Sequence, residues 1–460
     1  MKFDVVIVGG GPAGIISALT AKNVYPRKSV CLIKEIGDSI IPCAIPYMIN
    51  TMPDPRQNAM GDEPLRGAGI EIIVAKAVAI NTKDRNVTLQ SGDKISFERL
   101  ILATGTDAVR PPVEGINKKG VFTISKSMSA MVALREKIHS IQNIVIIGGG
   151  FIGSEFADEL AKIPGKEVHL VEIMPKLLFS AFDDEFCDKI EEVMTEEGVH
   201  IHTNRRVASI NGNSHVDSVT LDNGETLKAD IVILGAGAKP SIEIAKEAGL
   251  RITDKGSIWV DDYMQTNTEG IFAVGDCALK RDFFTRREVP VWLASTATSE
   301  ARNAGVNLYG IRVLNQMPGT LAAFSTRFGN VSFASAGMID RTVKRENFRA
   351  VCSAVVSYDR HPITLPEACE CKVKLCYSPR SGIVLGGQLY GCAAVGELIN
   401  VIALAIQKAV TVREIDMMQI ATHPLLTAAP TVHPLINAAH QALAQMRAMV
   451  KEEEEWPRKE

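Results

Sequence analysis

The chain has 460 residues, of which 46 % are hydrophobic and 22 % are charged. This composition excludes a disordered or fibrous protein, and the length predicts about three globular domains. The formal net charge of −3 gives no electrostatic reason to expect nucleic acid or an anionic membrane as a partner. Apolar runs stay below the roughly 18 residues of a membrane span, and the first is too short for a signal peptide, so we expect a cytoplasmic protein.

Two segments of the chain combine an apolar run, a glycine cluster and helical spacing. Residues 5–8 and 144–147 are β-branched runs that predict strands buried in a parallel sheet. The glycines that follow them are Gly9, Gly11 and Gly14 in the first segment and Gly148, Gly150 and Gly153 in the second. Such glycines allow a tight turn and bring backbone N–H groups close to a pyrophosphate, so each segment predicts a dinucleotide site.

An acidic residue closes the next predicted strand in both segments. Glu35 ends the strand 29–33, about 20 residues after the first glycine loop, and Glu172 ends the strand 168–171. A carboxylate at this place accepts hydrogen bonds from a ribose and repels a 2′-phosphate. Because no Arg follows Glu172, the second site is expected to take NADH rather than NADPH.

Further strands are predicted where apolar runs end at glycine-containing turns, at residues 101–103, 231–234 and 271–274. In the last third, residues 372–377 and 383–390 flank a turn and predict a hairpin. An amphipathic helix follows, with Val395, Leu398, Ile399, Ile402 and Ile406 on one stripe. The predicted fold class is therefore α/β with two Rossmann-like domains, followed by a C-terminal α+β domain.

These motifs resemble those of the pyridine nucleotide–disulfide oxidoreductase family over nearly the whole chain. The resemblance implies FAD in the first site and NAD(P)H in the second, and a homodimer. It also implies that the second Rossmann-like domain is inserted in the first. The implied division is an FAD domain at 1–115 and 247–325, an NAD(H) domain at 116–246, a dimerisation domain at 326–450 and a charged tail at 451–460. The motifs are Gly9-Gly10-Gly11-Pro12-Ala13-Gly14, Ala103-Thr104-Gly105, Gly148-Gly149-Gly150-Phe151-Ile152-Gly153-Ser154-Glu155 and Thr268-Glu269-Gly270-Ile271-Phe272-Ala273-Val274-Gly275-Asp276.

The resemblance also assigns roles to individual residues. In the first site it places Thr104 and Gly105 along the FAD, Asp276 at its ribityl or pyrophosphate region, and the backbone of Val78 at the adenine. A helix beginning near Ala294 is expected to point its positive end at the flavin pyrimidine. In the second site Phe151 matches an aromatic gate over the flavin, and Glu155 matches an acid beside the nicotinamide.

Cys43 is the candidate redox-active residue among nine cysteines. It precedes a predicted helix at 45–49, whose N-terminus lowers the pKa of a thiol. The resemblance places the redox-active cysteine here, but Met48 stands where two-cysteine members have the second. The chain is thus similar to the single-cysteine branch. That branch contains coenzyme A-disulfide reductases, persulfide or polysulfide reductases, and NADH oxidases and peroxidases.

Three local sequences bear on the substrate. Residues 43–47 resemble the Cys-Gly-Leu-Pro-Tyr of coenzyme A-disulfide reductases. Pro12 stands where peroxidases and water-forming oxidases usually carry a His, which argues against peroxide reduction. Of the Asn-Lys-Gln-Gly-Arg stretch of coenzyme A-type members, residues 298–302 keep only Arg302, which argues against tight coenzyme A binding.

His423 is the candidate general acid. His423-Pro424 resembles the His-Pro motif that two-cysteine reductases present to the partner subunit, although Ala428 replaces the orienting Glu. His433 is a second candidate. The remaining cysteines, including Cys369 and Cys371, lack Cys-x2-Cys spacing, so we expect thiols without a metal.

The sequence thus predicts an FAD-dependent oxidoreductase that uses NADH to reduce a small disulfide, persulfide or polysulfide through Cys43, with coenzyme A as a possible part of the substrate. One alternative is an NADH oxidase in which O₂ reacts at the flavin. A third hypothesis is a redox-responsive interaction protein that binds both dinucleotides and turns over slowly.

Overall fold

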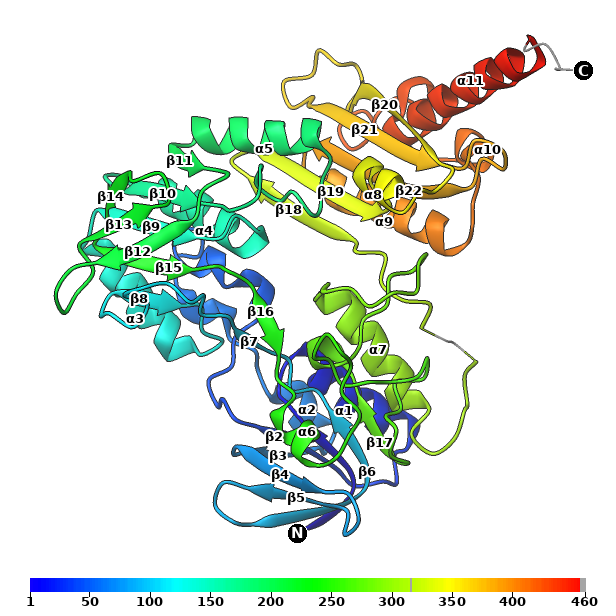
Figure 1. Cartoon of the computed structure of the whole chain (residues 1–460). Coiled ribbons are helices and arrows are strands. Elements are labelled where there is room, and N and C mark those ends of the chain that lie inside the picture. The colour runs from blue at the N-terminus through cyan, green and yellow to red at the C-terminus, as the bar shows by residue number, and fades with distance from the viewer. Residues whose placement is uncertain (315–316, 456–460) are drawn as a thin grey trace, which may run out of the picture. The chain divides into compact units, whose positions relative to one another are not determined.

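The computed structural model describes residues 1–314 and 317–455, and its chain forms two compact units (Figure 1). The first unit consists of Met1–Gly148, Glu159–Val171 and Arg206–Thr320. The second consists of Gly149–Asp158, Glu172–Arg205 and Leu321–Glu460. The α/β fold class predicted from the sequence is confirmed.

A seven-stranded sheet forms the centre of one half of the first unit, with the order β3-β2-β1-β6-β5-β4, and β17 also pairs with β6. The strands β3, β2, β1, β6 and β17 are parallel, so their carboxyl ends meet at one edge. Val5–Val8 in β1 are at most 5 % exposed, as expected for a strand covered on both faces. The strand bounds are β1 Lys2–Val8, β2 Val30–Lys34, β3 Glu71–Val74, β4 Ala77–Asn81, β5 Asn86–Leu89, β6 Lys94–Leu102 and β17 Ile271–Ala273.

Helices α1 (Pro12–Val24) and α7 (Ala294–Val306) pack against each other beside this sheet. Their close approach depends on Gly305, where an added Cβ would lie 2.8 Å from the Thr20 side chain. Short helices α2 (Glu63–Gly67) and α6 (Glu243–Glu247) complete this half of the unit.

A second parallel sheet in the first unit comes from chain between β6 and β17. Its strands lie in the order β10-β9-β15-β8. A three-stranded antiparallel sheet, β12-β13-β14, shares a buried apolar cluster with β15. The bounds are β7 Thr106–Ala108, β8 Val121–Thr123, α3 Met128–His139, β9 Asn143–Ile147, β10 Glu167–Val171, β12 Val207–Asn211, β13 Ser218–Leu221, β14 Thr226–Lys228, β15 Ile231–Leu234 and β16 Ala238–Pro240.

The second unit contains a five-stranded antiparallel sheet with the order β18-β19-β22-β21-β20. The predicted hairpin is β21 and β22, and the predicted amphipathic helix is α9, which packs on β19 and β22 (Figure 1). Both predictions are confirmed by the element bounds. These are α4 Phe151–Ala161, which begins in this unit, α5 Asp184–Glu196, β11 Val199–His202, β18 Phe324–Phe328, β19 Val331–Gly337, α8 Asp340–Arg345, β20 Val351–Tyr358, β21 Glu370–Tyr377, β22 Val384–Gly391, α9 Val395–Gln407, α10 Val412–Asp416 and α11 Pro434–Glu455.

One expectation about the C-terminal part is corrected by the structure. Cys352 and Cys376 form a disulfide, so the prediction that all cysteines other than Cys43 are thiols is wrong for this pair. They are directly paired across β20 and β21 with 4.1 Å between their Cα atoms, a proximity that their separation of 24 residues conceals. Helix α11 continues to Glu455, so the predicted tail 451–460 begins inside a helix, and residues 456–460 lie outside the described part.

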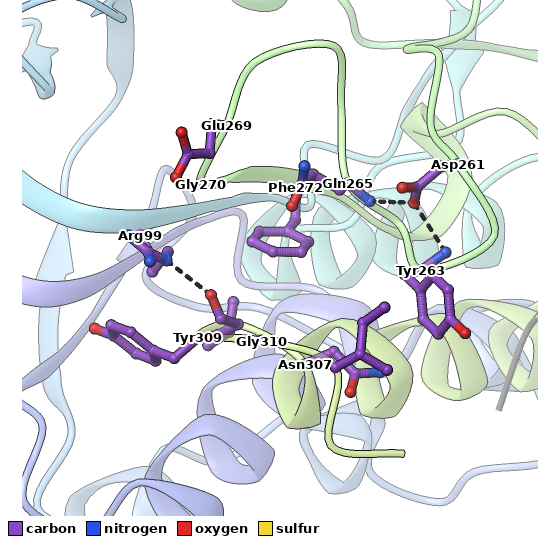
Figure 2. Close-up of a pocket in the computed structure, with 12 residues that line it drawn as sticks. Arg99, Asp261, Tyr263, Gln265, Glu269, Gly270, Phe272, Asn307, Tyr309 and Gly310 are labelled. Carbon is purple, nitrogen blue, oxygen red and sulfur yellow. Dashed lines mark hydrogen bonds between the residues drawn. The ribbon is translucent and has the colours of Figure 1, made fainter. Parts of the chain in front are cut away.

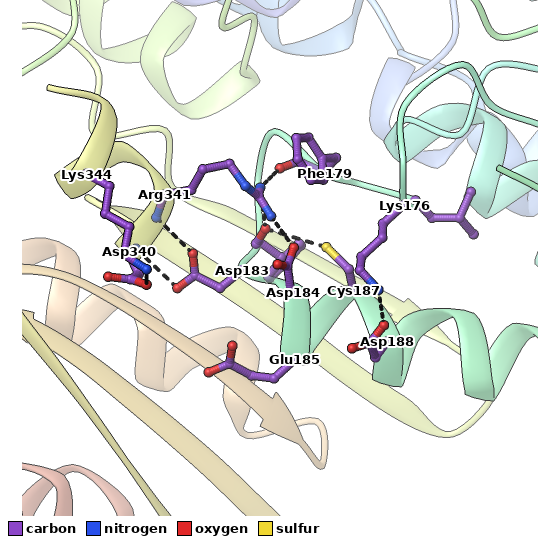
Figure 3. A network of polar contacts seen from close by, with 12 residues as sticks. Lys176, Phe179, Asp183, Asp184, Glu185, Cys187, Asp188, Asp340, Arg341 and Lys344 are labelled. Atoms are coloured by element: carbon purple, nitrogen blue, oxygen red, sulfur yellow. Dashed lines mark hydrogen bonds and ion pairs between the residues drawn. The ribbon is translucent and has the colours of Figure 1, made fainter. Parts of the chain in front are cut away.

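The buried carboxylate of Asp183 joins several elements of the second unit. It accepts hydrogen bonds from Gln388 Nε2 (2.6 Å) and Lys374 Nζ (2.8 Å). It also accepts a bond from the backbone N–H of Asp340, at the start of α8 (Figure 3). Burial by itself would raise the pKa of Asp183. The hydrogen bond and positive charge of Lys374, together with the hydrogen bonds from the other donors, outweigh burial and bring the pKa below its usual value. The ionised carboxylate therefore stabilises this fold.

We predict that Asp183→Asn lowers the free energy of unfolding by about 1.5–3 kcal/mol, the range for hydrogen bonds to a buried charged group. Because the pKa of Asp183 is lowered, this contribution is complete above pH about 4 and disappears as the pH falls through the lowered pKa. Urea unfolding of the holoenzyme at several pH values measures it.

Asp184→Asn is the matched control. Asp184 pairs with Arg341, but its side chain is 66 % exposed, so its loss should cost less than about 1 kcal/mol. Equal losses in the two variants at neutral pH would contradict the assignment of Asp183 as the stabilising carboxylate.

Candidate functional site

The first glycine loop is shaped by backbone packed on backbone. Gly9 has a φ of +121°, and an added Cβ would lie 2.0 Å from the carbonyl oxygen of Ala103, at the end of β6. A Cβ on Gly14 would lie 1.8 Å from the carbonyl oxygen of Gly9. At Gly11, by contrast, no atom of the described residues lies within 4 Å of the added Cβ. The loop therefore leaves its open side at Gly11, where a phosphate can approach the helix N-terminus.

The residues that follow the neighbouring parallel strands meet this loop. A Cβ on Gly275 would lie 2.9 Å from the Cβ of Ala13, so the Gly275-Asp276 turn packs against the start of α1. Pro12 is the first residue of α1. Thr104, after β6, donates a hydrogen bond to the Ser241 carbonyl (2.6 Å), and Gly105 follows it with a φ of +71°. The structure thus brings the loop, Thr104, Gly105 and Asp276 together at one edge of the sheet.

A buried ion pair supports the Asp276 turn. Lys280 and Glu300 lie 2.9 Å apart, and their side chains are only 2 % and 4 % exposed. Glu300 accepts a hydrogen bond from the Gly275 N–H (2.8 Å), and Lys280 donates to the Gly275 carbonyl (2.5 Å). Burial raises the pKa of Asp276 and of Glu300, partly offset by Lys280. The sequence analysis missed this pair because Lys280 and Glu300 are 20 residues apart and no sequence pattern marks either charge as buried.

Other predicted residues of the first site lie along the same sheet. Glu35 follows β2 and forms an ion pair with Lys76 (3.0 Å), while 60 % of its side chain stays exposed. Val78 is in β4. Ala294 is the first residue of α7, as expected, and within the described residues no side chain caps this helix start. Its first backbone N–H groups are therefore available to a ligand.

The second glycine loop repeats the pattern of the first. Gly148 has a φ of +110°, and an added Cβ would lie 2.5 Å from the carbonyl oxygen of Gly235, after β15. Around an added Cβ at Gly150, the described part of the chain has no atom within 4 Å. Gly153 is buried in α4, one turn further on.

Glu172 supports this loop directly. It is 8 % exposed, and its two carboxylate oxygens accept hydrogen bonds from the N–H groups of Gly149 (2.5 Å) and Met174 (2.7 Å). The cavity beside it, of about 120 Å³, is lined by residues that include Gly150, Phe151 and Lys176. Lys176 is ion-paired with Asp188 (Figure 3). The sequence analysis missed this cation because it considered only an Arg directly after Glu172.

Phe151, the first residue of α4, and Glu155, four residues later, both contact β18. The Phe151 ring stacks on Phe324 with 4.7 Å between the ring centroids and 23° between the planes. Glu155 Oε1 accepts a hydrogen bond from Thr326 Oγ1 (2.8 Å). The aromatic ring and the acid therefore lie on one face of α4, held by the first strand of the antiparallel sheet.

Cys43 is exposed, and its side chain is a thiol. The predicted helix at 45–49 is corrected: the segment forms two 3-10 turns, Pro42–Ala44 and Pro46–Met48, and Cys43 lies inside the first. Prolines at 42 and 46 start each turn, so a regular helix cannot form across them. A three-residue turn has only a small dipole, so the expectation that a helix N-terminus lowers the pKa of this thiol no longer applies.

The chain after Cys43 is firmly anchored within the first unit. Met48 is fully buried, and its carbonyl accepts a hydrogen bond from Arg135 of α3 (3.1 Å). The N–H and hydroxyl of Thr51 donate to Glu159 of α4 at 2.7 and 2.8 Å. Cys43 is thus an exposed residue on a rigid support.

The two candidate histidines differ in environment. His423 is exposed, and its Nδ1 accepts a hydrogen bond from the Leu425 N–H (3.3 Å), which leaves Nε2 to carry the ring proton. His433 is 8 % exposed, its Nδ1 lacks a hydrogen-bond partner among the described residues, and burial lowers its pKa. Burial disfavours the protonated ring that a general acid needs, so His433 is the poorer of the two candidates. Ala428, which stands in place of the orienting Glu of the His-Pro motif, is buried, with 2 % of its surface exposed.

A larger cavity, of about 340 Å³, lies elsewhere in the first unit (Figure 2). It is lined by Glu269 and Gly270 before β17, whereas Asp276 follows that strand. Arg99 is held there by the Leu308 carbonyl (2.7 Å) and by the Tyr309 ring. The predicted site residues do not contribute to this cavity.

Within 1–314 and 317–455, no group of three or more His, Cys, Asp or Glu residues could hold a metal ion. Over the same residues, no helix is both long enough and apolar enough to cross a membrane.

These features define a protein with two glycine loops that are each open to a phosphate at the end of a parallel strand. Comparison with known proteins identifies its class. Residues 3–301 match the family described as pyridine nucleotide-disulphide oxidoreductase, and residues 324–433 match the dimerisation domain of that family. The chain belongs to the pyridine nucleotide-disulphide oxidoreductase family, which confirms the predicted oxidoreductase with FAD and a nicotinamide dinucleotide as cofactors.

Similar proteins have related names. The chain is 32 % identical over 446 residues to the NAD(P)H coenzyme A polysulfide/persulfide reductase of Pyrococcus horikoshii, covering 95 % of this chain and 98 % of the relative. It is 28 % identical to an NADH oxidase of Methanocaldococcus jannaschii, over 96 % and 99 % of the two chains. A solved NAD-dependent persulfide reductase from A. fulgidus superposes with a TM-score of 0.90 at 27 % identity, covering 98 % of this chain and 84 % of that one.

We predict that Glu300→Leu weakens FAD retention and lowers stability, because it leaves Lys280 buried without its partner. The double variant Lys280→Met/Glu300→Leu should recover stability, since an apolar pair replaces a buried ion pair at little cost. It should not recover FAD retention, because Gly275 still lacks its acceptor. Thermal unfolding and the flavin-to-protein absorbance ratio measure the two effects. A double variant that retains flavin as the wild type does would show that the pair supports stability alone.

Proposed function

We propose that this protein uses NADH to reduce a low-molecular-weight disulfide, persulfide or polysulfide through Cys43. One observation carries the proposal. Cys43 is an exposed thiol, and the buried Met48 stands where two-cysteine members have their second cysteine. A single thiol has to form its redox bond with a sulfur from outside the chain. The names of the relatives support the same substrate class.

The residues of the first site fit an FAD. The open side of the loop at Gly11 and the uncapped start of α7 at Ala294 offer backbone N–H groups to phosphate and to a reduced flavin ring. Asp276 is held close by and is available to the hydroxyls of a ribityl chain, and Glu35 to those of a ribose. Bound FAD supplies the two-electron step that connects NADH with sulfur.

The second site fits NADH. Gly150 leaves room for a pyrophosphate, and the Glu172 carboxylate puts negative charge where NADPH carries its 2′-phosphate. Asp188 neutralises Lys176, the cation in this cavity, which further favours the unphosphorylated ribose. Phe151 and Glu155, held on one face of α4, are assigned to cover and orient the nicotinamide.

The sulfur step begins at Cys43. Its thiolate attacks one sulfur of a disulfide R–S–S–R, forms Cys43–S–S–R and releases one thiolate. Two electrons from NADH then cleave this mixed disulfide, returning the Cys43 thiolate and a second thiolate. The net reaction consumes one NADH, one disulfide and one proton and yields NAD⁺ and two thiols. A persulfide or polysulfide follows the same steps, with sulfide or a shortened chain as a product.

His423 is assigned as the donor of a proton to the leaving thiolate. The exposed ring donates in its imidazolium form, and loss of the proton leaves a neutral ring whose Nδ1 accepts the hydrogen bond from the Leu425 N–H. We place it at the active site of the partner subunit in a homodimer built on the dimerisation domain at 324–433. Direct reduction of O₂ at the flavin is the second candidate, favoured by the relative named NADH oxidase. Pro12 in the loop disfavours a peroxide-reducing version.

We predict that Cys43→Ser abolishes NADH-dependent reduction of disulfides and polysulfides, because the hydroxyl cannot form the mixed disulfide. Flavin reduction by NADH, followed anaerobically by loss of flavin absorbance, should persist in the variant and serves as the internal control. Disulfide reduction at the wild-type rate by this variant would overturn the mechanism. Wild-type oxygen consumption that exceeds sulfur reduction, and persists in Cys43→Ser, would identify the oxidase instead.

We predict that His423→Asn lowers kcat for disulfide reduction by about 10²-fold, the size of a general-acid contribution. The loss should be largest for substrates whose leaving thiol has a high pKa, since these need the proton most. His433→Asn is the comparison variant. If His433→Asn alone showed this dependence on the leaving thiol, the roles of the two histidines would be reversed.

A further inference from the structure

Two cysteines outside the proposed site meet at one end of the β21–β22 hairpin. Cys369 directly precedes β21 and Cys392 directly follows β22, and these strands are antiparallel, with Lys372 opposite Tyr390. The chains are close at this end, since an added Cβ on Gly391 would lie 2.7 Å from the Glu370 carbonyl oxygen. The Cys369 and Cys392 side chains are hydrogen-bonded to each other, and both residues are partly exposed.

Asp359 holds the pair in place. Its backbone N–H donates to the Cys369 carbonyl (3.1 Å), and its Oδ1 accepts from the Cys369 N–H (2.8 Å). The Cys392 thiol is also hydrogen-bonded to the Asp359 side chain, which is buried and ion-paired with Arg360 (2.7 Å). Arg360 in turn donates to the Leu426 carbonyl (3.2 Å) in the loop that carries His423.

The two sulfur atoms are electronically different. The hydrogen bond from Cys392 lowers the pKa of Cys369, and the same bond, with burial and Asp359, raises the pKa of Cys392. Cys371, two residues along β21, is fully buried, and burial raises the pKa of its thiol to about 12. Of the three neighbouring thiols, one is therefore suited to attack, one to remain protonated beside it, and one is inert.

We propose that Cys369 and Cys392 form a second redox-active site, a dithiol that is oxidised to a disulfide by low-molecular-weight disulfides. The Cys369 thiolate attacks R–S–S–R, forms Cys369–S–S–R and releases one thiolate. Cys392 loses its proton to the released thiolate and attacks the Cys369 sulfur, which expels the second thiolate. Two thiols of the protein are thereby oxidised and one external disulfide is reduced to two thiols. Neither NADH nor Cys43 takes part.

The test uses the flavin-loaded full chain carrying Cys43→Ser, with hydroxyethyl disulfide as the probe and without NADH. After acid quenching and alkylation of the remaining thiols, intact mass and peptide mapping locate the products. The expected protein carries two alkyl groups fewer than the untreated chain alkylated in the same way, with Cys369 linked to Cys392 and Cys371 alkylated. Alkylation of both Cys369 and Cys392 after treatment would overturn the proposal.

Two further variants in the same background separate the roles. Cys392→Ser should trap the hydroxyethylthio group on Cys369 as a stable mixed disulfide, and Cys369→Ser should leave Cys392 unmodified. A trapped group on Cys371, or equal modification in both variants, would also overturn the proposal. Because Cys43 is absent throughout, a failure here is distinguishable from a failure of the proposed sulfur reduction.

Discussion

The contact of the Gly9 backbone with the Ala103 carbonyl is the constraint on which the first site depends. A Cβ on Gly9 would lie only 2.0 Å from the Ala103 carbonyl oxygen, and Gly9 has a positive φ. The loop after β1 can therefore approach the end of β6 only if residue 9 is glycine. This approach turns the chain so that α1 starts at the sheet edge, with Gly11 left open. The second loop repeats the solution at Gly148 and Gly235. Both sites thus arise from close backbone packing at the ends of parallel strands.

Buried charges hold the loops that backbone packing alone leaves undetermined. In the first unit, Lys280 and Glu300 bind both the N–H and the carbonyl of Gly275 and so set the position of Asp276. In the second unit, Asp183 and Arg341 connect the segment before α5 to β21, β22 and α8. Glu172 holds the glycine loop by two backbone N–H groups. These carboxylates therefore act first on the chain itself, and any ligand meets a site already arranged.

Cys43 and the Cys369–Cys392 pair show two ways in which one chain can present sulfur. Cys43 is an exposed thiol on a support fixed by Arg135 and Glu159, and in the proposed reaction its sulfur partner comes from outside the chain. The hairpin pair supplies its own partner, with Asp359 keeping the two sulfurs together. Cys352 and Cys376, opposite each other in the same sheet, are already bonded. Cross-strand pairing, rather than sequence spacing, determines which thiols meet.

The sequence by itself determined the class of fold, the two glycine loops, the family and the candidate Cys43. Strand–glycine–helix order and strand periodicity are local properties, so the chain displays them without folding. Only the tertiary structure decided that Glu172 supports its own loop, that Lys176 enters the second cavity, and that proline-started 3-10 turns replace the helix after Cys43. The Lys280–Glu300 pair, the Cys352–Cys376 bond and the burial of His433 also appear only there. Ion pairing, disulfide bonding and burial depend on distances between residues far apart in the chain, which sequence order does not specify.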